Sequence, residues 1–150
     1  MRIAVVVDEG DPDQFNAAHP ILTGRLQPLA PDGTPLGPPE QVPDLITAMA
    51  AREQADHPRW VWATGQQLYP WLLRSGVRVA TCHDVALVEA LLLARDGHFN
   101  HPRSALAAWS RLNGLPVPPD PPPHEPQPAS RTGHQQSLFD PTPTTKPTPA

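Results

Sequence analysis

The residues from 59 to 93 alternate between two kinds of pattern, and this alternation constrains the fold more than any other part of the chain. A short β-favouring run at 59–63 is followed by a helical pattern at 66–74, a second short strand at 77–81 and an apolar helix that opens at His83 and Asp84. Strands that alternate with helices at this spacing predict a right-handed crossover between parallel strands. We therefore expect an α/β sheet.

Local signals set the ends of these elements. Thr64 and Gly65 break the first strand, and Ser75 and Gly76 end the helix that follows. Asp84 is placed as the N-cap of the next helix, where its carboxylate accepts a hydrogen bond from an unpaired backbone N–H group. That helix is apolar nearly all round, which predicts burial on more than one side. The positions concerned are Val85, Leu87, Val88, Leu91, Leu92 and Leu93.

The first half of the chain predicts three strands and a helix. A β-branched run at 2–7 is typical of a buried strand, and the turn sequence Pro31-Asp32-Gly33 separates 21–29 from 34–36 as an antiparallel hairpin. A helix begins at Pro43-Asp44 and ends at His57-Pro58, and a last helix is capped by Ser104. The predicted order is that of a ribonuclease H-like fold, in which an antiparallel three-stranded meander is extended by parallel strands with covering helices.

Composition divides the chain into two parts. It has 150 residues and 23 prolines, about half of which follow Leu115. The segment after Leu115 shows no helical or alternating apolar pattern, so we predict a domain at 1–115 and a disordered Pro-rich tail at 116–150. The proline-rich part should favour extended polyproline II.

Charge and cysteine content narrow the class of protein. The net charge of −4 provides no basic stripe, so bulk electrostatics give no indication of nucleic-acid affinity. The single cysteine, Cys82, excludes an internal disulfide. No stretch has the pattern of a signal peptide or the length of a membrane span, and we expect a cytoplasmic chain with no membrane partner.

The acidic cluster after the first strand is a candidate metal site. Asp8, Glu9 and Asp11 follow a predicted buried strand, and carboxylates at a sheet edge are typical ligands of Mg²⁺ or Mn²⁺. An ordinary surface loop after a strand has the same composition, so both interpretations stay open.

Two stretches of the second half resemble a known family. They are Leu-Tyr-Pro-Trp-Leu-Leu-Arg-Ser-Gly-Val-Arg-Val-Ala-Thr-Cys-His-Asp-Val-Ala-Leu-Val-Glu-Ala-Leu-Leu-Leu at 68–93 and Pro-Arg-Ser followed by Ala-Ala-Trp-Ser-Arg-Leu-Asn-Gly-Leu-Pro-Val-Pro within 102–118. Together they resemble the amino-terminal 3′-to-5′ exonuclease-like domain of family A DNA polymerases, above all that of the actinobacterial bifunctional exonuclease/polymerase proteins. The resemblance covers about 59–120 and extends only loosely to the first strands.

The resemblance implies a specific chemistry, which this chain carries only in part. Active proofreading relatives hold two divalent metal ions on four carboxylates. Asp8 fits the first position, but Glu9 stands one residue too early for the second. A turn that resembles the exonuclease motif is present as Gly65, Gln66, Gln67, Leu68 and Tyr69, yet Pro70 occupies the place of its aspartate. Asp84 matches a family aspartate that is not a metal ligand.

Charge arithmetic favours a degenerate site, because one or two carboxylates cannot hold two Mg²⁺ ions at catalytic spacing. The resemblance then implies a scaffold or tether that works beside DNA and a polymerase module in DNA replication or repair. One alternative is an active metal-dependent 3′-to-5′ exonuclease that uses Asp8 with Glu9 or Asp11. Another is an inert structural domain left by truncation.

The tail contains a short motif at Gln135, Ser137, Leu138 and Phe139. It resembles the pentapeptide that binds the bacterial sliding clamp, in which a glutamine precedes two adjacent apolar anchors. Gln136 stands where that pentapeptide prefers leucine. The alternative interpretation is a linker that binds nothing.

Overall fold

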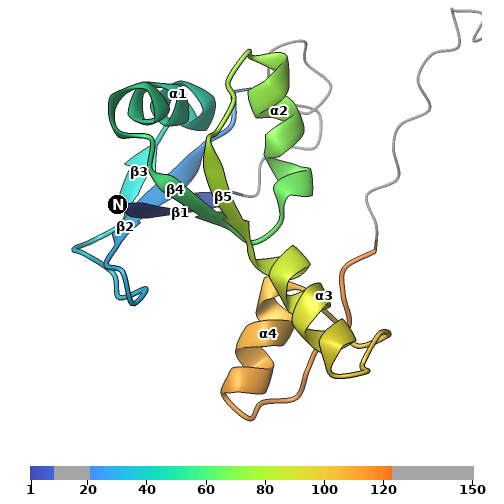
Figure 1. Cartoon of the computed structure of the whole chain (residues 1–150). Helices are drawn as coiled ribbons and strands as arrows, with labels where there is room; N and C mark the ends of the chain where they lie inside the picture. The colour runs from blue at the N-terminus through green and yellow to red at the C-terminus, as the bar shows by residue number, and fades with distance from the viewer. Residues whose placement is uncertain (9–20, 123–150) are drawn as a thin grey trace, which may run out of the picture.

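A computed structural model of the chain describes residues 1–8 and 21–122 (Figure 1). The fold is built on a five-stranded mixed sheet in the order β3-β2-β1-β4-β5. The first three strands pair antiparallel, whereas β4 is parallel to β1 and β5 is parallel to β4. The predicted α/β class and mixed sheet are therefore confirmed. The strands are β1 (Arg2–Val7), β2 (Gly24–Leu29), β3 (Glu40–Val42), β4 (Arg59–Trp62) and β5 (Thr81–Asp84).

Helices lie in two groups around this sheet. Figure 1 shows α1 and α2 packed beside the sheet, while α3 and α4 form a hairpin that projects beyond the end of β5. Within the described residues, no helix is long and apolar enough to cross a membrane. The helices are α1 (Leu45–Asp56), the short 3-10 helix η2 (Gly65–Gln67), α2 (Tyr69–Arg74), α3 (Val85–Arg95) and α4 (Ala105–Leu112).

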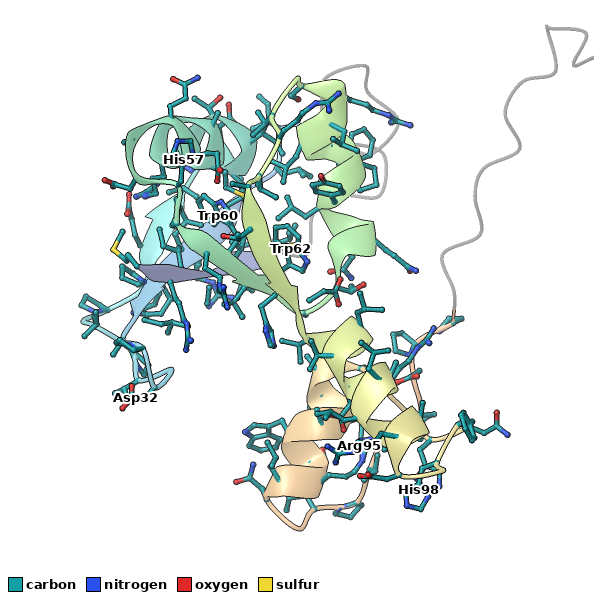
Figure 2. All side chains as sticks on the ribbon, in the orientation of Figure 1. Asp32, His57, Trp60, Trp62, Arg95 and His98 are labelled. Atoms are coloured by element: carbon teal, nitrogen blue, oxygen red, sulfur yellow. The ribbon has the colours of Figure 1, made fainter. Side chains whose placement is uncertain are left out.

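The core lies between the sheet and the first two helices. Ile3 on β1 lies opposite Trp60 on β4 in the sheet, and both side chains are almost fully buried. Trp60 and Trp62, two residues apart, lie on the same side of β4 (Figure 2). Met49 of α1 and Leu72 of α2 close the cluster and have no exposed surface.

The third strand was predicted at 34–36, but β3 lies at Glu40–Val42. The earlier segment makes only one isolated bridge, between Leu29 and Pro35. Asp32 begins the turn by accepting a hydrogen bond from the Thr34 N–H at 2.9 Å. Prolines 35, 38 and 39 have no N–H to donate, so regular pairing starts only after them. The second strand is also shorter than predicted and begins at Gly24 rather than at 21.

The fifth strand was predicted at 77–81 and lies instead at Thr81–Asp84. The Ala80 N–H is held by the carboxylate of Glu53 at 2.9 Å, so it is not available to the sheet. Val77 and Val79 pack against the core from outside the strand. The sheet register therefore starts with Thr81 opposite Arg59 and ends with Asp84 opposite Trp62.

The prediction that the helix after Asp84 is buried on several sides is wrong. No residue of α3 is buried, and the side chains of Leu87 and Leu91 are 60% and 64% exposed. Helix α3 begins at Val85, directly after the last residue of β5. Because no loop intervenes to turn the chain back over the sheet, the helix leaves the sheet edge and packs beside α4 (Figure 1).

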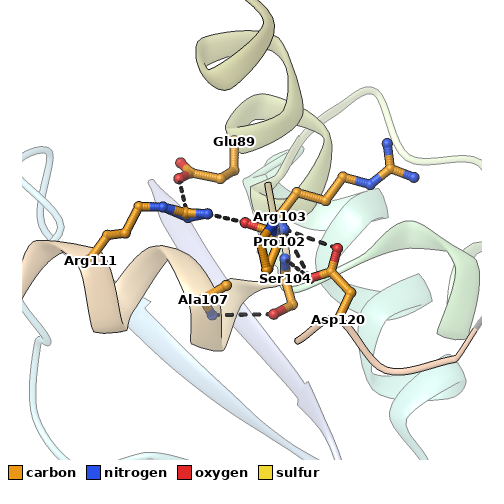
Figure 3. A network of polar contacts seen from close by, with 7 residues as sticks. All are labelled: Glu89, Pro102, Arg103, Ser104, Ala107, Arg111 and Asp120. Carbon is orange, nitrogen blue, oxygen red and sulfur yellow. Dashed lines mark hydrogen bonds and ion pairs between the residues drawn. The ribbon is translucent and has the colours of Figure 1, made fainter. Parts of the chain in front are cut away.

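The segment that follows α4 has no helix or strand up to residue 122, yet it contacts the hairpin. The carboxylate of Asp120 accepts hydrogen bonds from the backbone N–H groups of Arg103 and Ser104, at 2.9 and 2.8 Å (Figure 3). Ser104 in turn caps α4 through the N–H of Ala107. The predicted tail, which begins at 116, therefore starts with residues that are attached to the domain.

Candidate functional site

The carboxyl ends of β1, β4 and β5 meet at one edge of the sheet, and most of the predicted site residues lie there. Since the three strands are parallel, the residues that follow them occupy the same edge. Asp8 follows β1, Gly65 follows β4 and Asp84 ends β5. Glu9 and Asp11 lie outside the described residues.

Asp8 is bound to the antiparallel half of the sheet. Its Oδ1 lies 3.3 Å from Nε of Arg25 on β2, and its Oδ2 accepts a hydrogen bond from Nε2 of Gln41 on β3 at 2.5 Å. Both strands lie on the side of β1 opposite to β4. The Arg25 guanidinium thus neutralises a carboxylate that a divalent cation would need, and both carboxylate oxygens already have protein partners.

Asp84 joins the end of β5 to the turn after β4. Its Oδ2 accepts a hydrogen bond from the Gly65 N–H at 2.5 Å, and its Oδ1 accepts one from the Leu87 N–H at 3.0 Å. The second contact is the N-cap of α3, as predicted from the sequence. This carboxylate is engaged on both oxygens and acts as a structural link between three elements.

The turn at 65–69 is shaped by close packing around Gly65. A Cβ atom at this position would lie 3.0 Å from Asp84 Oδ2 and 3.3 Å from Trp62 Nε1, so only glycine fits without displacement. Leu68 is buried in the core, and the Tyr69 ring lies 6.1 Å from that of Trp62. The two glutamines, Gln66 and Gln67, are exposed.

A small cavity of about 90 Å³ lies between the end of β1 and this turn. Val6, Thr64 and Gln67 are among its lining residues, together with Trp62. The indole Nε1 of Trp62 is buried and has no hydrogen-bond partner among the described residues. The cavity has room for a few water-sized groups and is too small for a nucleotide, so it is not by itself a substrate pocket.

The described part of the chain contains no group of three acidic, histidine or cysteine side chains placed to hold a metal ion. The predicted Mg²⁺ or Mn²⁺ site at Asp8 and Asp11 stays a prediction, because the second residue lies outside the described ranges. Within 1–8 and 21–122, Asp8, Asp84 and the turn at 65–69 lie at the same edge of the sheet, but both carboxylates are bound by protein groups.

A buried carboxylate that the sequence analysis missed lies in the core. Glu53 on α1 accepts hydrogen bonds from Trp60 Nε1 at 2.6 Å and from the Ala80 N–H at 2.9 Å, and its Oε1 lies 3.3 Å from Nδ1 of His57. Figure 2 shows His57 and Trp60 at this corner of the molecule. Burial raises the pKa of Glu53, but the hydrogen bonds from Trp60 and Ala80 and the contact with His57 outweigh it, so the pKa is lowered overall.

The sequence contains only a weak indication that Glu53 is buried. It lies four residues after Met49, on the face of α1 that the apolar spacing directs to the core. Its partners come from β4 and from the segment before β5, so Glu53 fastens α1 to the parallel half of the sheet. Both oxygens of Glu53 have protein partners and the residue does not line the cavity, so we assign it a structural role.

The clamp-like residues Gln135, Ser137, Leu138 and Phe139 lie outside the described residues. Comparison of the chain with protein-family models, with curated proteins and with solved structures found no match.

Proposed function

We propose that this chain is an exonuclease-like domain of the ribonuclease H-fold type found at the amino-terminal side of family A DNA polymerases. In this proposal the domain serves as a non-catalytic scaffold or tether. The observation that carries the proposal is the strand order β3-β2-β1-β4-β5, with the Gly65-Gln66-Gln67-Leu68 turn at the carboxyl end of β4. The order is compatible with an antiparallel meander extended by two parallel strands, and the turn is part of the resemblance to that family.

The scaffold role rests on how the carboxylates at that edge are used. Asp8 is paired with Arg25, and Asp84 binds the N–H groups of Gly65 and Leu87. Pro70 occupies the first turn of α2, where the resemblance calls for an aspartate. A two-metal mechanism needs several free carboxylates around one point, and the described part of this edge supplies none.

The tail would supply the tether. A short motif with two adjacent apolar anchors, Leu138 and Phe139, has the chemistry of a peptide that inserts into a preformed pocket on the bacterial sliding clamp. Binding there would hold the scaffold, and any polymerase module attached to it, near DNA.

The proposal is tested by a nuclease assay combined with metal titration. The full chain is incubated with a 5′-labelled single strand and Mg²⁺ or Mn²⁺, and its thermal midpoint is followed with the same ions. We expect no shortening from the 3′ end and no rise in the midpoint, since an ion that binds only the folded state would raise it. Shortening that disappears in Asp8→Ala would overturn the scaffold proposal and establish the active exonuclease.

A further inference from the structure

Helix α4 buries its small residues and exposes its large ones. Ala107 and Ser110 are buried in the hairpin, whereas Leu106, Trp109 and Leu112 are 59%, 54% and 86% exposed. These three residues recur every third position and form what we call the α4 stripe. An amphipathic helix normally packs its large apolar residues against the core of its own domain. The exposed α4 stripe therefore indicates that another surface covers it in the assembled protein.

The exposed apolar surface is concentrated around the hairpin. Of the 14 large hydrophobic residues that are exposed in the described chain, nine lie between residues 87 and 117. Leu87 and Leu91 form a second stripe on α3, one helical turn apart. Exposed apolar side chains gathered on one part of a monomer are typical of an interaction surface.

The charges of the hairpin decide what kind of partner fits. Glu89 is the only charged residue of α3 before its last turn, and Arg111 is the only one of α4. The two are paired with each other at 3.0 Å, and Arg111 also donates to the Pro102 carbonyl (Figure 3). At the end of α3, Arg95 pairs with Asp96. The stripes therefore offer a partner apolar contact and no unpaired charge within either helix.

We infer that the α4 stripe is the centre of a homodimer interface, in which a second copy of this chain packs its own α4 antiparallel against the first. A two-fold axis brings identical surfaces together, which is unfavourable for a charged patch and favourable for a neutral apolar one. Trp109 lies two positions from Arg111 and therefore on the side of α4 that faces away from α3, so α4 of a second copy can pack on the α4 stripe while α3 keeps its place beside α4. An aromatic anchor among apolar residues is typical of an interface core, and Trp109, between Leu106 and Leu112, provides it.

The test is the molar mass of the full chain by sedimentation equilibrium over a range of concentrations. Wild type should show a reversible dimer, and Leu112→Glu should raise its dissociation constant by about tenfold or more. Trp109→Ser is a second variant that acts on the same stripe. Leu36→Glu is the matched control, because Leu36 is 54% exposed in the loop after β2, far from the hairpin in sequence, and this variant should dimerise like wild type. Circular dichroism verifies that each variant is folded.

Three results would overturn the inference. The first is a wild-type chain that stays monomeric at every soluble concentration. The second is a dimer that Leu112→Glu and Trp109→Ser leave intact, or that Leu36→Glu abolishes, since the interface would then lie elsewhere. The third is a wild-type chain that stays monomeric while the combined Leu138→Ala and Phe139→Ala variant dimerises, which would mean that the tail covers the stripe in the same chain. The nuclease assay is independent of all three, so failure of the dimer leaves the proposed function standing.

Discussion

Glu53 shows how one buried carboxylate can organise several elements. It is a helix residue whose partners are a side chain of β4, the backbone before β5 and the histidine that ends its own helix. The carboxylate is 8% exposed, and a buried acceptor of this kind is tolerated because donors surround it. The contact with the Ala80 N–H also explains why the fifth strand begins at Thr81.

The variant Glu53→Gln should lower the free energy of unfolding by about 1–3 kcal/mol at neutral pH, because the amide cannot accept from all three donors. The ordinary pKa is 4.5 and the folded pKa lies below it, so the stabilisation by Glu53 is complete above that pH and is lost as the pH falls through the folded pKa. Urea denaturation of both proteins at neutral and acidic pH measures this, and the difference should shrink in acid. Asp56→Asn, an exposed neutralisation in the same helix, should change stability by less than about 0.5 kcal/mol. A constant difference at all pH values would contradict the account.

Gly65 is a residue whose identity follows from close approach rather than from an unusual backbone angle. In Gly65→Ala the new Cβ meets Asp84 Oδ2 at 3.0 Å and Trp62 Nε1 at 3.3 Å, so the turn must shift. We expect a loss of about 1–3 kcal/mol in the free energy of unfolding. Gln66→Ala, at the exposed neighbouring position, serves as the control and should be nearly neutral. Equal stabilities of the two variants in a denaturant titration would show that the turn has spare room.

At the scale of the element, Asp84 connects a strand, a turn and a helix. Asp84→Ala removes the acceptor for two backbone N–H groups, whereas Ser104→Ala removes only the acceptor for Ala107 at the start of α4. We expect a loss of about 2 kcal/mol for the first variant and about 1 kcal/mol for the second. Thermal or urea unfolding measures which of the two variants loses more free energy of unfolding. A structural role also requires that the response to added Mg²⁺ be unchanged in Asp84→Ala, and a changed response would make Asp84 a metal ligand.

Helix α3 shows that the same apolar pattern can fit two environments. Its many leucines are typical of a helix buried in one chain, yet in this chain Leu87, Leu91 and Leu92 are exposed. The difference depends on where the chain goes next. Since Val85 follows Asp84 without a loop, α3 projects from the edge of the sheet and carries its apolar surface with it.

At the scale of the whole molecule, the proposal joins a folded domain to a clamp-binding tail. The full chain should bind the bacterial sliding clamp, and the combined Leu138→Ala and Phe139→Ala variant should bind at least about tenfold more weakly, because these residues are the apolar anchors of the motif. Fluorescence anisotropy of the labelled chain with purified clamp measures this. Gln136→Leu, which restores the residue that the pentapeptide prefers, should tighten binding. Equal affinity of wild type and the double variant would exclude the tether.

The sequence by itself determined the features that depend on local pattern. The strand at Arg2–Val7, the α/β class, the helix caps at Asp84 and Ser104 and the turn after β4 all depend on residues within a few positions of one another. These local signals do not depend on the rest of the chain, so the corresponding structural features could be predicted from residue types and their spacing.

Only the tertiary structure decided the features that depend on distant partners. The Asp8 carboxylate is bound by Arg25 and Gln41, which lie 17 and 33 positions away, and no local sequence pattern predicts these contacts. Glu53 fixes the start of β5 through Ala80, 27 positions away. The exposure of α3 likewise follows from the direction in which the chain leaves the sheet. The pairing of Asp8, the start of β5 and the exposure of α3 all depend on which surfaces contact each other in the folded chain. A sequence pattern describes one of those surfaces but not the surface that packs against it.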